Sequence, residues 1–220
     1  TYTASLAGGA GGVSDVSGNL LAASSVWSFT VRAGTTTAVT SSLNPSVFGQ
    51  GVTFTATVVP VAPATGTPTG TVQFRVGTTN LGTPVALASG VASSPVIGTL
   101  AAGSQSITAV YSGDANFTTS TSPALTQTVN RADTATTVTL SSANPSVFGQ
   151  AVTFTATVTA LAPGAGVPAG SVQFRDGATL LGTGTLSGAS ATFTTTAPLS
   201  IGARSITATY VGNTSFNAST

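Results

Sequence analysis

The sequence predicts an all-β protein made of two tandem β-sandwiches preceded by an incomplete β segment. Three observations support this prediction: a set of motifs that occurs twice, an alternation of apolar and polar side chains with a period of two, and turn residues between the alternating runs. No stretch shows the spacing of an amphipathic helix. The 220 residues, 41% of them hydrophobic, suffice for two separate cores.

An internal repeat divides the chain. The motif NPSVFGQ occupies residues 44–50 and again 144–150, and VTFTATV occupies 52–58 and 152–158. SITA at 106–109 returns at 205–208, so the second copy has lost one residue, which we place in a loop between the middle strands. We therefore expect three units, joined without a linker long enough for much independent motion: a partial segment over 1–34, a first sandwich over 35–131 and a second over 132–220.

Within each copy the alternation predicts strands with one buried side. In VTFTATV the apolar side chains share one face and the Thr side chains share the other; the apolar set is Val52, Phe54, Ala56 and Val58. The same pattern predicts strands over 71–75 and 106–111, and over 171–175 and 205–210. Turn signals such as Asn44-Pro45 separate the runs. About seven short strands in each copy describe a sandwich of the immunoglobulin type.

The stretch SPALTQTVN, residues 122–130, occurs in the first copy alone. The second copy aligns with the first as far as Thr220, which matches Thr121. We expect the second sandwich to lack its final strand, so that a row of backbone donors and acceptors and a slot in the core stay open. Leu125 and Val129 indicate what that slot needs, namely two apolar side chains on one face of a short strand.

The first 34 residues contain two expected strands, roughly from Tyr2 to Leu6 and from Ser25 to Arg32. Trp27, Phe29 and Val31 alternate onto one apolar face of the second strand. Because a lone hairpin is not stable in water, this face needs a cover. We regard Trp27, Phe29 and Val31 as a candidate assembly strand.

The repeated motifs carry a family resemblance. The order NPSVFGQ-x-VTFTATV, then PTGTVQF or PAGSVQF, then LAAGSQSITAVYSGDANF resembles the bacterial immunoglobulin-like repeats found in tandem in large secreted and cell-surface proteins. The resemblance covers residues 35–220 and implies an extracellular or cell-surface spacer, stalk or adhesin module, with no catalytic residues to carry over. The first 34 residues resemble the end of a second bacterial immunoglobulin-like family, through Asp15, Gly18, Asn19, Leu20, Trp27 and Phe29.

Two explanations account for the missing strand and the segment before the first sandwich. In one, the chain is a window of a longer array, and its partners are neighbouring immunoglobulin-like domains. In the other, the N-terminal segment of one copy completes the second sandwich of the next by strand addition, which gives a head-to-tail homopolymer. Only 4% of residues are charged, so little repulsion keeps copies apart, which favours assembly. The two explanations are not exclusive.

The composition argues against catalysis and cofactors. His, Cys, Glu and Lys are absent, which removes the usual general bases, nucleophiles and nitrogen or sulfur metal ligands. The four Asp residues are spread along the chain, so we expect no catalytic, cofactor-binding or metal site and no enzyme activity. A net charge of +1 without a basic cluster predicts no nucleic-acid partner, and no apolar run is long enough to span a membrane.

Four residues have both a structural and a functional interpretation. We expect Asp114 and Asn116 to cap a turn by hydrogen bonding, since a Ca²⁺ site needs six to eight oxygen ligands. We expect Tyr111 and Tyr210 to be buried rings whose hydroxyls fasten a corner of each sandwich; the alternative is a stacking platform for sugars.

Three classes of function follow from these observations. The first is a non-catalytic structural module of an extracellular bacterial stalk or filament. The second is an adhesin module that recognises a carbohydrate or a protein at the cell surface. The third is an accessory domain of a large secreted enzyme. Arg75 and Arg175 follow VQF at equivalent positions, and we expect both on the outer face, with Arg175 near Asp176.

Overall fold

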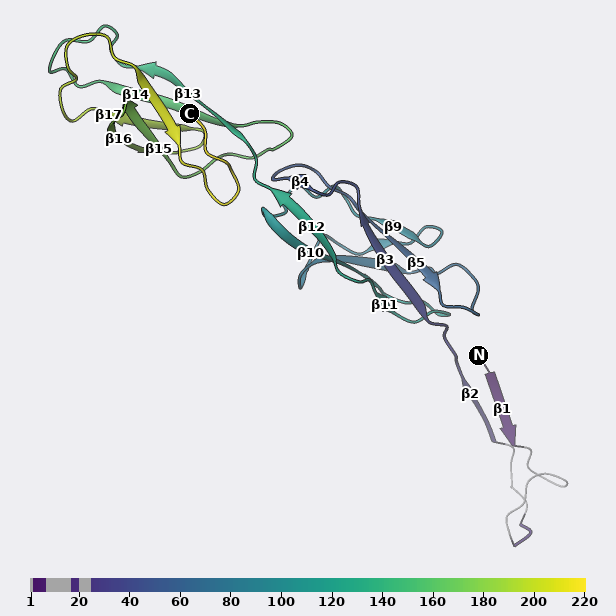
Figure 1. Ribbon diagram of the computed structural model, residues 1–220. Coiled ribbons are helices and arrows are strands. Elements are labelled where there is room, and N and C mark those ends of the chain that lie inside the picture. Colours follow the sequence, from purple (N-terminus) through teal and green to yellow (C-terminus); the bar gives the residue numbers. More distant parts are fainter. Residues whose placement is uncertain (1, 7–16, 20–24) are drawn as a thin grey trace.

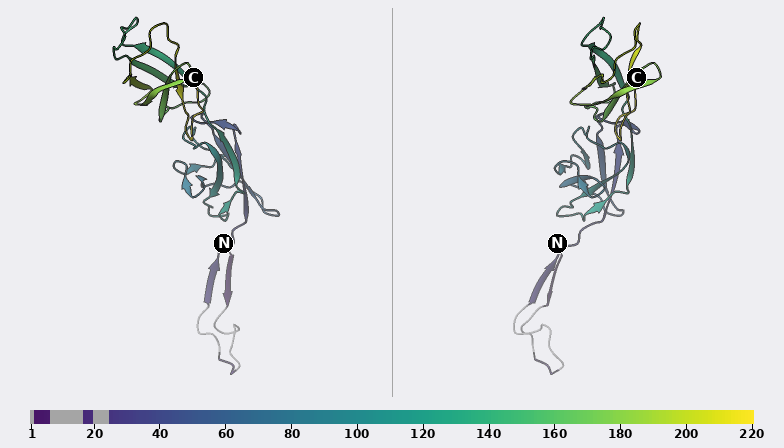
Figure 2. Two further views of the ribbon diagram at one scale, coloured as in Figure 1. Left: turned by 60° about the vertical axis from the view of Figure 1, so that its left-hand side comes forward. Right: turned by 90° about the vertical axis from the view of Figure 1, so that its left-hand side faces the viewer.

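The computed structural model describes residues 2–6, 17–19 and 25–220, and every regular element in this part of the chain is a strand (Figure 1). A hairpin leads into two sandwiches that follow one another end to end (Figure 2). Within the described residues, no helix is long and apolar enough to cross a membrane. The prediction of an all-β chain with tandem sandwiches is confirmed.

The hairpin consists of β1 (Tyr2–Leu6) and β2 (Ser25–Phe29), which pair antiparallel. β1 has the predicted bounds. β2 ends earlier than the predicted Arg32, because the ladder stops where the first residue of β1 lies opposite the last residue of β2. Val31 therefore lies beyond the strand, with 62% of its side chain exposed.

The first sandwich has two sheets. One has the order β3 (Thr35–Ser41), β5 (Phe54–Pro60) and β9 (Val91–Ser93). The other has the order β4 (Ser46–Val47), β12 (Leu125–Asn130), β10 (Gly103–Tyr111), β6 (Thr71–Val76) and β7 (Thr79–Asn80). Two short strands extend this sheet: β8 (Val85–Ala86) on β6 and β11 (Ser120–Thr121) on β10. The pairs are antiparallel except that β4 and β12 run parallel.

The core of the first sandwich lies between these sheets and follows the predicted alternation. The apolar face of VTFTATV is at most 1% exposed: Val52, Phe54, Ala56 and Val58. The facing sheet contributes the buried side chains of Val72, Phe74, Ile107, Ala109 and Tyr111. Burial of each large apolar side chain stabilises the fold by about 1.5–3 kcal/mol, so this packing is the main source of stability.

The second sandwich repeats the arrangement with fewer strands. One sheet has the order β13 (Thr134–Ser141), β14 (Thr153–Ala160) and β17 (Ser190–Thr194). The other has the order β16 (Thr179–Thr185), β15 (Ser171–Asp176) and β18 (Ile206–Tyr210). Within the residues that the structure describes, no strand takes the places that β12 and β4 have in the first sandwich. We expected this from the sequence for β12 and made no prediction for β4.

The one-residue deletion lies where β7 is separated from β8. Pro84 stands between these two strands, whereas in the second sandwich β16 runs on as one strand along β15. Leu87 donates its N–H to the Gly70 carbonyl, and Leu186 makes the equivalent bond to Gly170. The difference in residue number between the two copies has therefore fallen by one at this point. Because proline has no N–H and resists strand pairing, the extra residue forms a short loop in the first copy.

The junction between the sandwiches, residues 130–133, is fastened to the second sandwich through Ala132. Its N–H donates to the Ser215 carbonyl at 3.0 Å, and its carbonyl accepts from the Asn217 N–H at 2.8 Å. Ala33 makes the equivalent pair of bonds at the start of the first sandwich. Each sandwich is therefore joined to the preceding segment in the same way.

Candidate functional site

Asp114 closes a turn of the first sandwich with four hydrogen bonds. Its Oδ1 accepts from the backbone N–H groups of Asn116 and Phe117, both at 2.8 Å. Its Oδ2 accepts from the N–H of Thr69 at 2.8 Å and from the Thr69 hydroxyl at 2.7 Å. The backbone bond from Thr69 is the largest cause that holds the pKa of Asp114 well below its usual range. The predicted turn cap is confirmed for Asp114.

The second sandwich uses Asn213 in the same place. Its Oδ1 accepts from the N–H groups of Ser215 and Phe216 at 2.8 and 2.9 Å. A neutral amide thus serves where a carboxylate does in the first copy, as expected for a structural cap. Among the residues that the structure describes, no three His, Cys, Asp or Glu side chains are grouped to hold a metal, and Asp15 lies outside those residues.

Tyr111 and Tyr210 end β10 and β18, and both are fully buried. The Tyr210 hydroxyl donates to the Ala169 carbonyl at 2.9 Å, which confirms the predicted fastening. The Tyr111 hydroxyl is buried with no hydrogen-bond partner in the described structure, so the prediction is wrong there. Burial and the neighbouring Asp114 carboxylate raise the pKa of Tyr111 to about 12. Buried rings do not offer stacking platforms for sugars.

Asp176 forms an ion pair with Arg204: Nη1 of Arg204 lies 3.3 Å from Oδ2 of Asp176. Arg175 instead donates to the carbonyl of Ala178 and to Oε1 of Gln173, both at 3.2 Å. The expected association of Arg175 with Asp176 is therefore wrong, because successive side chains of β15 point to opposite faces of the sheet.

β12 shows what the second sandwich lacks. It pairs antiparallel with β10, from Leu125 opposite Ile107 to Val129 opposite Gly103. On its other side it runs parallel to β4. The strand is thus a central member of its sheet, and Val129 is 3% exposed in the core.

Two side chains add to the ladder that holds β12. Asn44 forms two hydrogen bonds with the backbone of β12: Nδ2 donates to the Thr126 carbonyl at 2.7 Å, and Oδ1 accepts from the Thr128 N–H at 2.9 Å. Gln127, fully buried, donates from Nε2 to the Leu43 carbonyl at 2.9 Å. The Asn44 contacts involve only the backbone of β12, so any strand in the same register satisfies them.

The corresponding place in the second sandwich is an open groove with a volume of about 570 Å³. Asn144, the counterpart of Asn44, lines it together with Val147, Phe154, Leu199 and Ile206. β18 begins at Ile206, although its counterpart β10 begins four residues earlier in the repeat. Residues 202–205 are the aligned segment and lie outside any strand, and Gly202, Ala203 and Arg204 of this segment line the groove. Backbone that pairs with β12 in the first sandwich is therefore left at the rim of this groove.

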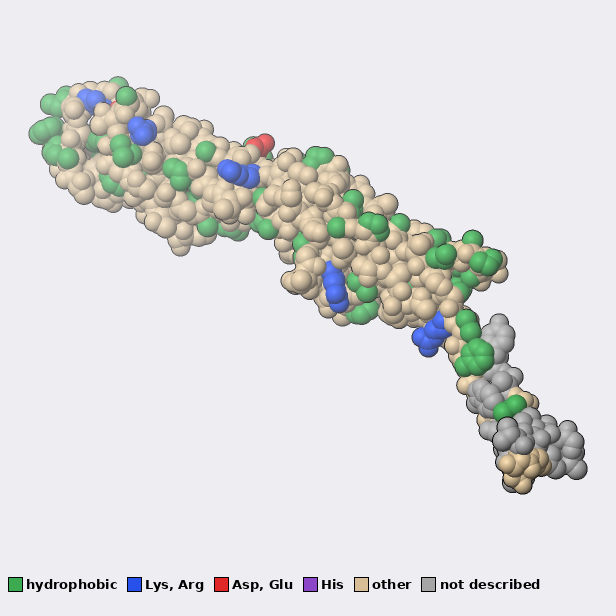
Figure 3. All heavy atoms as spheres, turned by 60° about the horizontal axis from the view of Figure 1, so that its bottom comes forward, with side chains coloured by type: hydrophobic (Ala, Val, Ile, Leu, Met, Phe, Trp, Pro, Cys, Tyr) green, Lys and Arg blue, Asp and Glu red, His purple; other side chains and the backbone are tan. Residues whose placement is uncertain are grey.

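The NPSVFGQ loop has a different environment in each copy. Val47 and Phe48 are half-buried, whereas Val147 and Phe148 are 75% and 66% exposed. Ile201, which lines the same groove, is 84% exposed. We call Val147, Phe148 and Ile201 the distal patch. Hydrophobic side chains gather at this end of the second sandwich, at the left in Figure 3. Such a grouping of exposed apolar side chains is typical of an interaction surface.

In the first sandwich two different elements cover the same loop. β12 covers it from one side, where the Phe48 N–H donates to the Asn130 carbonyl at 2.8 Å. The second sandwich covers it from the other, where the Ala165 N–H donates to the Phe48 carbonyl at 3.1 Å and the Phe48 ring packs against Phe216. Phe48 thereby belongs to the edge of both cores.

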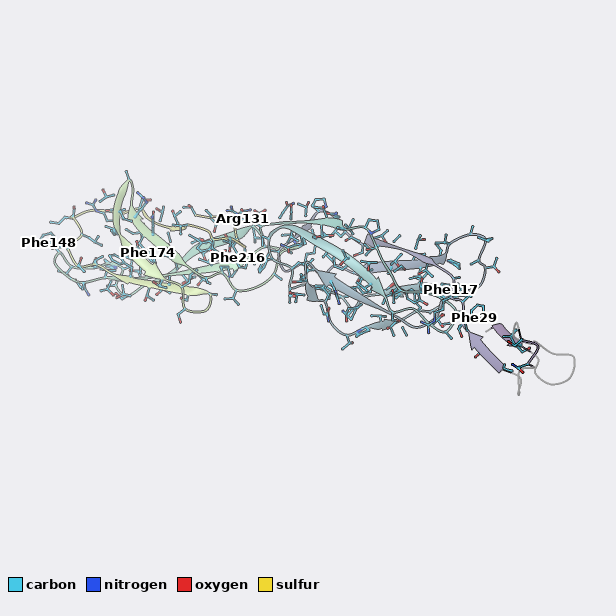
Figure 4. The ribbon with its side chains drawn as sticks, turned by 90° about the horizontal axis from the view of Figure 1, so that it is seen from below. Phe29, Phe117, Arg131, Phe148, Phe174 and Phe216 are labelled. Carbon is cyan, nitrogen blue, oxygen red and sulfur yellow. The ribbon has the colours of Figure 1, made fainter. Side chains whose placement is uncertain are left out.

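The predicted assembly residues lie away from the groove of their own copy, and their insertion into the groove of another copy stays a prediction. The side chain of Trp27 lies outside the described residues, and Phe29 and Val31 are 53% and 62% exposed. Phe29 lies at the opposite end of the molecule from Phe148 (Figure 4). The distal patch was not predicted from the sequence. Val147 and Phe148 form an apolar pair in an expected loop, and such a pair is a signal that another segment covers it.

Comparison with known proteins identifies the domain type. The family described as bacterial Ig-like domain (group 3) matches residues 39–130 and 138–220. Among solved structures, fibronectin(III)-like modules of Clostridium thermocellum CbhA are similar over 84% of this chain and 89% of theirs, with 19% sequence identity and a TM-score of 0.33. No curated protein matches the chain.

Proposed function

Because the chain belongs to the bacterial Ig-like domain family, group 3, we propose that it is a non-catalytic structural module of an extracellular bacterial stalk or filament. Domains of this family are generally found in extracellular or surface proteins and serve as structural or binding modules. Of these two roles, the structural one explains the tandem arrangement, because two sandwiches joined in a fixed way hold their two ends at a fixed distance.

The observation that carries this proposal is the fastening between the two sandwiches. The junction is anchored by the two hydrogen bonds of Ala132, and the Phe48 loop contacts the second sandwich through a hydrogen bond and an aromatic pair. A flexible linker would make none of these contacts. The fastening supports a stiff, elongated unit, which is what a spacer or stalk requires.

The low charge of the chain also supports a structural role. Only 4% of its residues are charged, so neighbouring molecules repel one another weakly. The outer positions of strands such as β5 and β14 are taken by Thr, which suits half-exposed sheet surfaces. Such a surface tolerates close packing in a filament or a dense surface layer.

The finer form of the proposal is head-to-tail polymerisation by strand complementation. β2 of one copy would supply the strand that the groove of the preceding copy lacks, with Trp27, Phe29 and Val31 as the buried face. The groove at one end and the exposed β2 segment at the other support this form, as does Asn144, which lines the groove and is the counterpart of Asn44.

Domain alignment in solution tests the structural role. We expect residual dipolar couplings of the two sandwiches to fit one common alignment tensor, and small-angle scattering to give an elongated particle. A control with four Gly residues inserted between Arg131 and Ala132 should give two tensors. Independent tensors in the natural chain would contradict the structural role and favour the adhesin alternative, in which each domain works as a separate binding unit.

A further inference from the structure

We infer that the distal patch of one copy docks on the base of the first sandwich of a second copy, by which we mean the surface around Ala33, Thr65, Gly66 and Phe117. The contacts would be the same as those that join the two sandwiches within the chain. The inference rests on the proposed structural role and names its partner, a second copy, and the surfaces that meet. The structure already contains one copy of this interface, between its two sandwiches.

The NPSVFGQ loop of the second sandwich already has the conformation of its covered counterpart. The Val147 N–H donates to Oε1 of Gln150 at 2.9 Å, as the Val47 N–H does to Gln50 at 2.9 Å. The glycine that follows Phe in the motif has φ 84° in the second copy and φ 83° in the first. A loop that keeps the docked conformation while exposed has little ordering entropy left to lose on binding.

The base of the first sandwich reproduces the surface on which the loop docks. Ala33 donates to the Asn116 carbonyl at 2.8 Å and accepts from the Thr118 N–H at 2.9 Å, as Ala132 does in the second sandwich. Gly66 lies beside Phe117 with φ 112°, and Gly166 lies beside Phe216 with φ 114°. Thr65 stands where Ala165 provides the N–H that bonds to the Phe48 carbonyl.

In the docked arrangement Phe148 of one copy would pack against Phe117 of the next, as Phe48 packs against Phe216. The Thr65 N–H would donate to the Phe148 carbonyl. Phe148 lies at one end of the pair of sandwiches and Phe117 at the other (Figure 4). The interface is therefore heterologous and does not close on itself within one pair, so it propagates as a filament.

The same placement brings β2 to the groove. Ala33 of the second copy would take the position that Ala132 has at the junction, and the residues before it would run along 202–206 as β12 runs along β10. β2 would exchange β1 for this edge. If β2 takes the same register as β12, Val26, Ser28 and Thr30 point inward. Burial of the face that contains Trp27 requires a register shift of one residue, which a β-bulge supplies.

Disulfide trapping tests the docking, because the chain has no Cys of its own. We expect the double variant Phe148→Cys with Thr65→Cys to form a ladder of covalent oligomers on oxidation at high protein concentration. Two controls accompany it. Phe48→Cys with Ala165→Cys, the internal counterpart, should oxidise within the monomer. Phe148→Cys with Thr83→Cys, which places the second thiol in the exposed loop between β7 and β8, should not form a ladder.

The inference would be overturned if the variant with Phe148→Cys and Thr65→Cys stayed monomeric under conditions in which the internal control forms its disulfide. Sedimentation of the unmodified chain decides the matter without any Cys: we expect its average mass to rise with concentration and Phe148→Asp to suppress the rise. A strict monomer at all concentrations would equally overturn the docking. A single alignment tensor together with a strict monomer would leave the structural role standing, so the two failures are distinguishable.

Discussion

The ring of Phe48 packs edge-on against the ring of Phe216, with centroids 5.2 Å apart and planes at 77°. This pair connects the NPSVFGQ loop of the first sandwich with the turn that follows β18 in the second. Edge-to-face aromatic pairs contribute about 0.5–1.5 kcal/mol beyond the burial of their area. The contact makes the orientation of the two sandwiches depend on packed side chains. Four predictions rest on this contact and on the open groove, and a fifth rests on the Asp114 turn cap.

Truncation of Phe48 should loosen the junction. We expect Phe48→Ala to lower the free energy of unfolding by about 1–3 kcal/mol and to separate the alignment tensors of the two sandwiches, because the variant loses apolar contacts to both cores. Phe148→Ala is the matched control at an exposed position of the same motif, with an expected change within about 0.5 kcal/mol in dilute solution. Urea denaturation with NMR detection measures both, and equal effects would contradict the interface.

Gly49 and Gly149 form a second matched pair. Both have positive φ, so an Ala at either position costs about 1–2 kcal/mol of backbone strain. A Cβ at Gly49 would also collide with the backbone of Ala165, whereas a Cβ at Gly149 meets nothing within 4 Å. We therefore expect Gly49→Ala to reorient the sandwiches and Gly149→Ala to leave their orientation intact, as residual dipolar couplings would show. An unchanged orientation in Gly49→Ala would refute this.

A peptide with the sequence of residues 122–130, SPALTQTVN, should bind the groove of the second sandwich. We expect chemical-shift changes concentrated at residues 144–148 and 199–206, because these positions are counterparts of the contacts of β12. Asn144→Ala should weaken binding, since it removes the side chain that would grip the peptide backbone. A scrambled peptide of equal composition is the control. Shift changes spread over both sandwiches, or none, would contradict a preformed groove.

The face of β2 that enters the groove can be identified with two substitutions at exposed positions. Phe29 is 53% exposed and Val26 is 62% exposed, so Asp at either position should leave the monomer folded. If the Trp27, Phe29 and Val31 face is buried, Phe29→Asp abolishes self-association and Val26→Asp does not, because a carboxylate cannot be buried without a partner. The reverse result in sedimentation would assign burial to the other face.

Acid should affect the two sandwiches differently. The pKa of Asp114 is lower in the folded state, so its carboxylate contributes stability that is present above the ordinary Asp pKa, about 4, and is lost as the pH falls toward the folded value. Asn213 does not titrate. Asp114→Asn should therefore flatten the acid limb of the stability profile of the first sandwich, as followed by its own NMR signals. An acid limb unchanged by Asp114→Asn would show that the carboxylate contributes no pH-dependent stability.

The strands were predictable wherever one face is buried along the whole run. The face of Val52, Phe54, Ala56 and Val58 lies in the core as predicted, because alternate residues of a strand point to opposite sides. Where a prediction depended on a specific partner, the sequence was a weaker guide: Asp176 pairs with Arg204, 28 positions away in the chain, and not with the adjacent Arg175.

The sequence by itself determined the all-β class and the repeat, since alternation and repetition are properties of local order along the chain. Only the tertiary structure decided that identical NPSVFGQ loops have unequal surroundings, with Val47 half-buried and Val147 75% exposed. Burial depends on which other segments arrive at a surface, and β12 and the second sandwich arrive at the first loop from distant parts of the sequence. The same seven residues are therefore an internal joint in one copy and an exposed end in the other.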